Sequence, residues 1–140
     1  MLKTSSAYII NFEAIMDPRG DLTSIEYGST LPFIVKRAYY IYNVPAGATR
    51  GSHAHKNLRQ LIIAMSGSFT VNLDFGDAQN SFFLNNPRKG LFVNTMVWRE
   101  IVDFSQGAVC LVLASENYDP DDYIRSHELF LNQRKSINSI

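Results

Sequence analysis

The chain has 140 residues, 46% of them hydrophobic, which is enough for a compact domain with a buried core. Its 13 basic and 13 acidic residues cancel, so it lacks the net positive field typical of proteins that bind duplex nucleic acid. No apolar run approaches the roughly 20 residues that a membrane span requires. Residues 1–21 lack the apolar segment and small-residue cleavage site of a signal peptide, and we expect a cytoplasmic protein.

Short apolar or alternating runs, separated by glycine, proline and asparagine, predict strands along most of the chain. The first predicted strand, residues 7–12, is followed by a turn around Pro18 and Gly20. Two strands around a tight turn at Ser66-Gly67 are expected over residues 60–77. The other predicted strands cover residues 22–27, 33–44, 50–55, 80–86, 90–94, 97–104 and 108–115.

Only the end of the chain has a helical pattern. Asp119 is a candidate N-cap with Pro120 at the first helical position, and a helix over residues 121–135 would finish on two basic residues. About ten short strands followed by one helix predict an all-β jelly roll with a short C-terminal helix, formed by a single domain over residues 1–140. The only cysteine, Cys110, lies in an apolar run and is expected to be a buried thiol.

Positive charge gathers in the first 60 residues, at Arg19, Lys36, Arg37, Arg50, Lys56 and Arg59. Local positive charge in a neutral protein suits a small anion, such as a phosphate ester, better than a polymer. The alternative for any one of these side chains is an ordinary position on the surface.

Two of the three histidines, His53 and His55, stand in the run "RGSHAHK". Residues two apart on a strand point to the same face, so these imidazoles should project together. Three interpretations are open: half of a metal site, an acid–base pair, or two exposed polar residues.

The spacing around the histidines resembles the first motif of the cupin superfamily, in which a glutamate and then a glycine follow the pair. Here Gln60 and Gly67 hold those positions. The second cupin motif adds a histidine, and the matching region, residues 90–104, has none. Two histidines and a neutral amide are a weak donor set for zinc or iron. We therefore expect a cupin without metal or other cofactor, in which His53 and His55 carry out proton chemistry.

Five segments in order resemble a narrower family, the cupin-type sugar 3,4-ketoisomerases that act on dTDP-4-keto-6-deoxy-glucose and also occur within WxcM-like proteins. The segments are "DPRGDLTSIE", "PFIVKRAYYIYNV", "RGSHAHK", "GLFVNTMVWREIVDFS" and "VLASENYDPDDYIR". The resemblance implies a homodimer with exchanged N-terminal strands that converts a 4-keto sugar into a 3-keto sugar. It also implies a pathway of 3-amino sugars for surface polysaccharide, such as lipopolysaccharide O-antigen.

The same resemblance suggests roles for residues of the site. His53 matches the proposed base and His55 stands beside it, although which of them takes the C3 proton stays open. Tyr39 matches an active-site position, and alternation predicts that Arg37, Tyr39 and Ile41 share one face of a strand while Tyr40 and Tyr42 share the other. Packing is the alternative for both tyrosines.

A nucleotide diphosphate requires cations, and arginine forms bidentate contacts to phosphate. Arg37 and Arg50 are the first candidates, and Lys56 and Arg59 are weaker ones. Gln60 is counted with the residues that bind the substrate. Trp98 could stack on a base, and we expect it in the core instead.

Two further positions bear on product configuration. The resemblance implies that galacto-type members of the family have an arginine at the "D-x-R/Y-G" turn and a histidine after the tryptophan of "VW". Gluco-type members have a tyrosine and an arginine at the same two positions. This chain has Arg19 and Arg99, one residue of each type. Arg19 slightly favours the galacto product.

Three other functions remain open. A nucleotide-sugar 3,5-epimerase is a related metal-free cupin that pairs a histidine with a carboxylate and a tyrosine, and no carboxylate is evidently placed for His53. A non-catalytic cupin module could bind a sugar nucleotide without needing both histidines. A metal-dependent cupin is the most distant alternative.

Overall fold

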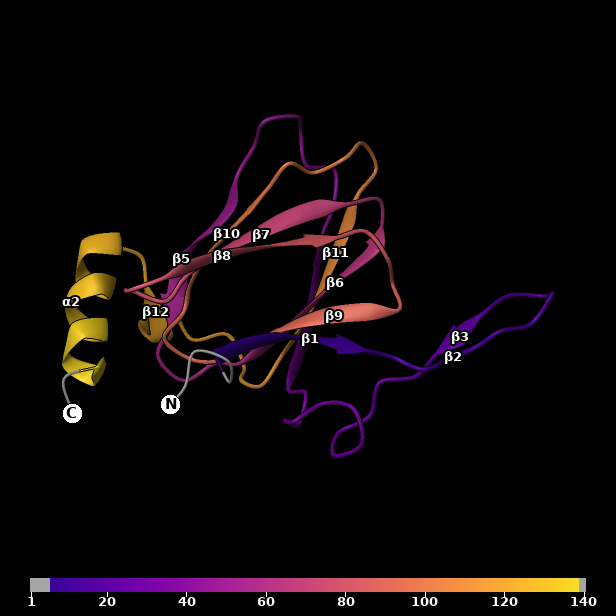
Figure 1. Ribbon diagram of the computed structural model, residues 1–140, viewed down its shortest axis with the longest axis horizontal. Coiled ribbons are helices and arrows are strands. Elements are labelled where there is room, and N and C mark those ends of the chain that lie inside the picture. The colour runs from indigo at the N-terminus through magenta and orange to yellow at the C-terminus, as the bar shows by residue number, and fades with distance from the viewer. Residues whose placement is uncertain (1–5, 139–140) are drawn as a thin grey trace.

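The computed structural model describes residues 6–138 as two facing antiparallel sheets with a helix at one end (Figure 1). One sheet has the order β1 (Ala7–Asn11), β9 (Lys89–Val93), β6 (Gln60–Ser66), β11 (Val109–Ala114) and β4 (Arg37–Ile41). The other has the order β12 (Tyr123–Ile124), β5 (Arg50–His55), β10 (Trp98–Val102), β7 (Phe69–Asp74) and β8 (Gln79–Leu84). This two-sheet arrangement is the jelly roll that the strand pattern predicts.

The main hydrophobic core fills the space between the two sheets. Alternation along each strand turns one row of side chains inward, including Ile62, Val71, Leu91 and Val112. Cys110 belongs to this core, and burial raises the pKa of its thiol to about 12. The expectation of a buried thiol is therefore confirmed.

The N-terminal segment packs on the outer face of the first sheet and then leaves the barrel. Phe12, Leu31 and Phe33 form a second apolar cluster with residues of β6 and β9. Between them, β2 (Ala14–Ile15) and β3 (Leu22–Thr23) form a separate hairpin that projects from the barrel (Figure 1). The strand predicted over residues 22–27 is thus limited to Leu22–Thr23, and that over residues 33–44 to Arg37–Ile41.

The predicted start of the C-terminal helix was wrong. Asp119 does cap a helix, but it is a 3-10 helix, Pro120–Asp122, followed by β12 and only then by α2 (His127–Asn138). Tyr123 and Ile124 pair with β5, and this sheet pairing interrupts the helical pattern. Ser126 precedes α2 and caps its start, with its Oγ accepting the Leu129 N–H at 3.2 Å. Among the described residues, no helix has the length and apolar character needed to cross a membrane.

Candidate active site

A cavity of about 410 Å³ lies between the two sheets and is lined by residues from both. β4 contributes Arg37 and Tyr39 from one side. The opposite sheet contributes side chains of β5, β10 and β12, among them Arg50, His53, Arg99 and Tyr123, and Arg125 follows β12. The sheets therefore bring together residues that stand up to 88 positions apart between Arg37 and Arg125.

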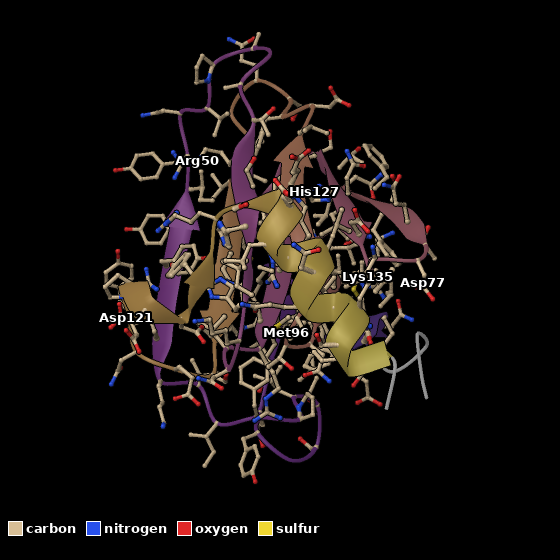
Figure 2. The ribbon with its side chains drawn as sticks, turned by 90° about the vertical axis from the view of Figure 1, so that its left-hand side faces the viewer. Arg50, Asp77, Met96, Asp121, His127 and Lys135 are labelled. Atoms are coloured by element: carbon tan, nitrogen blue, oxygen red, sulfur yellow. The ribbon has the colours of Figure 1, made fainter. Side chains whose placement is uncertain are left out.

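A β-bulge on β5 determines which of its side chains reach the cavity. Arg99 pairs with His53 and Glu100 pairs with Gly51, so Ser52 is an extra residue. Gly51 and Ser52 both have positive φ, at 88° and 61°. Strict alternation would turn Arg50 and His53 to opposite faces, and the bulge lets both line the cavity. Figure 2 shows Arg50 on β5.

The two faces of β4 are as alternation predicts. Arg37, Tyr39 and Ile41 line the cavity, whereas Tyr40 and Tyr42 are 63% and 57% exposed. The Arg37 guanidinium lies 4.5 Å from the centre of the Tyr39 ring and 5.2 Å from that of Tyr118. Burial raises the pKa of the Tyr39 phenol, which therefore remains protonated.

Gln60 connects the phenol to a buried arginine. Its Nε2 donates to Tyr39 Oη at 2.9 Å, and its Oε1 accepts from Arg99 Nη1 at 2.5 Å. Arg99 also donates from Nη2 to the Val97 carbonyl at 2.7 Å. Burial lowers the pKa of this guanidinium to about 10, so the side chain still carries its charge at neutral pH. Gln60 thus orients Tyr39 and Arg99 in the wall of the cavity.

His53 and His55 project to the same side, as their spacing predicts. Their ring centroids lie 4.7 Å apart in an edge-on arrangement. Burial, and next the charge of Arg99, lowers the pKa of His53 to about 4 and that of His55 to about 2. Both imidazoles are therefore neutral at physiological pH. His53 lines the cavity, and His55 lies behind it with no exposed surface.

Sequence reasoning did not identify three residues next to the histidines. Asp122 Oδ2 lies 3.0 Å from His55 Nδ1. The Tyr123 ring centroid lies 4.9 Å from that of His53 and 4.4 Å from that of His55, and the Arg125 guanidinium covers the Tyr123 ring at 4.3 Å. All three belong to the "DPDDYIR" run, whose helix-like start concealed the pairing of β12 with β5.

Four buried side-chain atoms of the described residues have no hydrogen-bond partner, and all four belong to this site. They are Arg37 Nη1, His53 Nδ1, His55 Nε2 and Arg99 Nε. Buried polar atoms are rarely left unpaired in folded proteins, so their concentration here indicates a ligand with polar groups. The cavity is lined by four arginines and by no carboxylate, which favours an anionic ligand.

Besides His55, three predicted site residues do not line this cavity. Arg19 lies on the connection between β2 and β3, where it is exposed and forms an ion pair with Asp17 at 2.9 Å. Lys56 donates to the Asp121 carbonyl at 3.2 Å, and the Arg59 guanidinium lies 5.6 Å from the Phe33 ring centroid. Trp98, expected in the core, is 7% exposed and packs near Phe130.

A family model and a curated relative each match most of the chain. The model of the family described as FdtA, WxcM-like, C-terminal, matches residues 5–135. A TDP-4-oxo-6-deoxy-α-D-glucose-3,4-oxoisomerase from Aneurinibacillus thermoaerophilus is 43% identical over 130 residues, which are 93% of this chain and 94% of that protein.

Two solved structures have the same overall fold. The sugar 3,4-ketoisomerase QdtA from Thermoanaerobacterium thermosaccharolyticum, in complex with TDP, has a TM-score of 0.93 and 42% identity, covering 98% of both chains. The TDP-quinovose 3,4-ketoisomerase WlaRB from Campylobacter jejuni has a TM-score of 0.88 and 43% identity, covering 92% of this chain and 99% of that one.

Proposed function

The chain belongs to the FdtA (WxcM-like, C-terminal) family of cupin-type proteins, and we propose that it converts dTDP-4-keto-6-deoxy-D-glucose into a dTDP-3-keto-6-deoxy-hexose. The observation that carries this proposal is the set of unpaired, buried polar atoms around a cationic cavity that contains a neutral histidine. An isomerase of this kind needs a base, fixed donors for a sugar oxygen and cations for a diphosphate.

His53 is the proposed base. It lines the cavity, and its lowered pKa of about 4 keeps the ring free to accept a proton at neutral pH. His53 removes the C3 proton of the sugar, and the electrons of that bond form a C3–C4 double bond and a negative charge on the C4 oxygen. A positioned base of this kind contributes about 10²–10⁴ in rate.

Arg99 and Tyr39 are the proposed donors to the sugar oxygens. Arg99 Nε is buried and unpaired, so it can donate to a charged oxygen without first losing another hydrogen bond. In the second half of the reaction, the C3 hydroxyl gives its proton to the negatively charged C4 oxygen, a proton enters at C4, and the C3 oxygen becomes that of the ketone. The steps balance, because one proton leaves C3 and one enters C4, the proton of the C3 hydroxyl moves to the C4 oxygen, and no electrons are gained or lost overall.

Arg37, Arg50 and Arg125 are the proposed contacts of the diphosphate. Arg50 and Arg125 are exposed, whereas Arg99 lies deep in the site, so positive charge extends from the surface to the reacting carbons. Lys56 and Arg59 do not line the cavity and are weaker candidates for this role.

A homodimer with exchanged N-terminal strands is part of the proposal. The projecting hairpin carries Ile15, Met16 and Leu22, which are 67%, 62% and 55% exposed. Tyr40 and Met65 add further exposed apolar area on the outer face of the first sheet, at 63% and 48%. Exposed apolar area on this scale is typical of an interface. In an exchanged dimer, Arg19 would serve the partner's cavity, because it lies outside its own.

The product would accept an amino group at C3 in the synthesis of surface polysaccharide. We keep the galacto configuration as the expected product, on the evidence of Arg19. Arg99 is the residue of the gluco type, so the two arginines predict opposite outcomes and the configuration depends on which one controls protonation at C4.

A second candidate function is a nucleotide-sugar 3,5-epimerase, and one observation favours it. The His55–Asp122 pair next to Tyr123 supplies the histidine, carboxylate and tyrosine that such epimerases combine. An epimerase would exchange the proton at C5, whereas a 3,4-ketoisomerase would not.

Proton NMR of dTDP-4-keto-6-deoxy-glucose with the protein in deuterated water separates these functions. A new 3-keto sugar carrying deuterium at C4 is the expected result. Deuterium at C5 would instead indicate the epimerase. An unchanged sugar, from folded protein that still binds dTDP, would indicate a non-catalytic binding module and overturn the proposal.

A further inference from the structure

Asp122 uses both of its carboxylate oxygens for contacts with different parts of the site. Oδ1 accepts the backbone N–H of Asn57 at 2.7 Å, and Oδ2 lies 3.0 Å from His55 Nδ1. The side chain is buried, and its backbone carbonyl accepts the N–H of Lys56 at 3.0 Å. Asp122 is therefore held by the turn after β5, and it cannot rotate without losing hydrogen bonds in a buried position.

The contact with Asp122 selects one tautomer of His55. A carboxylate only accepts hydrogen bonds, so His55 must present a proton on Nδ1. In a neutral imidazole the other nitrogen is then an acceptor. That nitrogen, Nε2, is one of the four buried atoms without a partner. We propose that Asp122 is a positioning residue, which holds His55 in the Nδ1–H tautomer so that Nε2 stays a hydrogen-bond acceptor beside His53.

An acceptor at this position matters for the reaction, and this part of the inference rests on the proposed isomerase. When His53 takes the sugar proton it becomes an imidazolium with two N–H donors and no acceptor. His55 packs edge-on against it at 4.7 Å, inside a site that already contains the Arg99 cation. An acceptor on His55 stabilises a protonated neighbour or a sugar hydroxyl, whereas an N–H on the same nitrogen would repel the protonated ring.

In the variant Asp122→Asn, we expect His55 to adopt the opposite tautomer, with its proton on Nε2. The Asn57 N–H still requires an acceptor, so the carbonyl oxygen of the introduced amide is expected to face Asn57. Its NH₂ group then faces His55 Nδ1, which must become an acceptor and leave the ring proton on Nε2. The alternative orientation points two donors at one another in a buried site, which is unfavourable. The aspartate of a Ser-His-Asp triad likewise holds its histidine in one tautomer.

Nitrogen-15 NMR of protein labelled at histidine tests the tautomer without any substrate. The His55 signals are identified as those lost in His55→Gln. In the native protein at pH 7, we expect a protonated Nδ1 and an unprotonated Nε2, and in Asp122→Asn the reverse. Asp121→Asn is the matched control, since it removes the same charge from an exposed neighbour at the outer edge of the molecule (Figure 2) and should retain the native pattern.

Steady-state kinetics tests the consequence for the reaction. For Asp122→Asn we expect kcat to fall by about 10²- to 10⁴-fold, the range for a positioned acid–base group, while KM changes by less than about threefold. Asp121→Asn should retain both constants. A raised KM with unchanged kcat would overturn the positioning role.

The outcomes separate this inference from the proposed function. A native His55 with its proton on Nε2, or an Asp122→Asn protein with the native tautomer, would overturn the role of Asp122 whatever the activity. If Asp122→Asn does not fold, the native tautomer alone decides. A native enzyme without isomerase activity would overturn the proposed function. The nitrogen-15 NMR signals of His55 would still test whether Asp122 sets its tautomer.

Discussion

Arg99 and His53 stand directly opposite each other in the β5–β10 pair, so a buried guanidinium faces the ring that is the proposed base. Its charge is the second largest cause, after burial, of the low pKa of His53. The same arginine is bonded to Gln60, which in turn bonds Tyr39. The proposed base therefore lies beside a hydrogen-bonded group, Arg99–Gln60–Tyr39, that contains the proposed oxygen donors.

Replacing His53 by asparagine should remove most of the activity without removing binding. We expect kcat to fall by about 10²- to 10⁴-fold, because the proton acceptor is lost. Calorimetric affinity for dTDP should change little, since the arginines remain. His127→Asn is the matched control: His127 lies at the start of α2, outside the cavity, and that variant should retain full activity (Figure 2). Equal losses in both variants would contradict the role of His53.

The activity and the stability should both decline on acidification. The pKa of His53 is lowered from 6.5 to about 4, so between these values the unfolded chain binds more protons than the folded one. Stability should therefore rise with pH across this window and be lost as pH falls from 6.5 towards 4. The value of kcat/KM should be flat above about pH 5 and fall near pH 4, where the base becomes protonated.

Denaturant unfolding of the native protein and of His53→Asn, measured at several pH values between 4 and 7, checks the stability part. The variant should have a smaller slope of unfolding free energy against pH in this window. His55 titrates at lower pH, about 2, and contributes to both proteins. Identical slopes would show that His53 does not lose its proton affinity on folding.

Product configuration should respond in opposite directions to changes at the two arginines. Arg99→His introduces the residue of galacto-type relatives and should raise the galacto fraction. Arg19→Tyr introduces that of gluco-type relatives and should lower it. Loss of the buried charge-assisted bonds of Arg99 should also reduce kcat by roughly 10- to 100-fold. Proton coupling constants at C4 of the product measure the ratio, and an unchanged ratio in both variants would contradict the assignment.

Gly51→Ala should damage the site through the β5 bulge. Gly51 has φ of 88°, and an added Cβ would lie 3.0 Å from the Arg99 carbonyl oxygen. We expect a loss of about 1–3 kcal/mol in unfolding free energy and weaker dTDP binding, because Arg50 is displaced. Gly107→Ala is the control, since its φ is 75° but nothing lies within 4 Å of the added carbon. Weakened dTDP binding in both variants would argue against a specific role of the bulge.

The sequence alone determined the features that depend on local spacing. Alternation correctly predicted the shared face of Arg37 and Tyr39 on β4 and the common direction of His53 and His55, because side chains alternate along any strand. The punctuated apolar runs predicted the two-sheet jelly roll. The five segments that carry the family resemblance lie within residues 17–125, inside the residues 5–135 that the family model matches.

The tertiary structure decided what depends on contacts between distant segments. The local sequence around Asp122 predicts the start of a helix. Asp122 contacts His55, 67 residues away in the sequence, only because β12 pairs with β5. Arg50 reaches the cavity through a bulge that forms against β10, and no alternating pattern predicts it. The depression of the histidine pKa values arises from burial and from Arg99, which are properties of the closed barrel and not of the "HAH" motif.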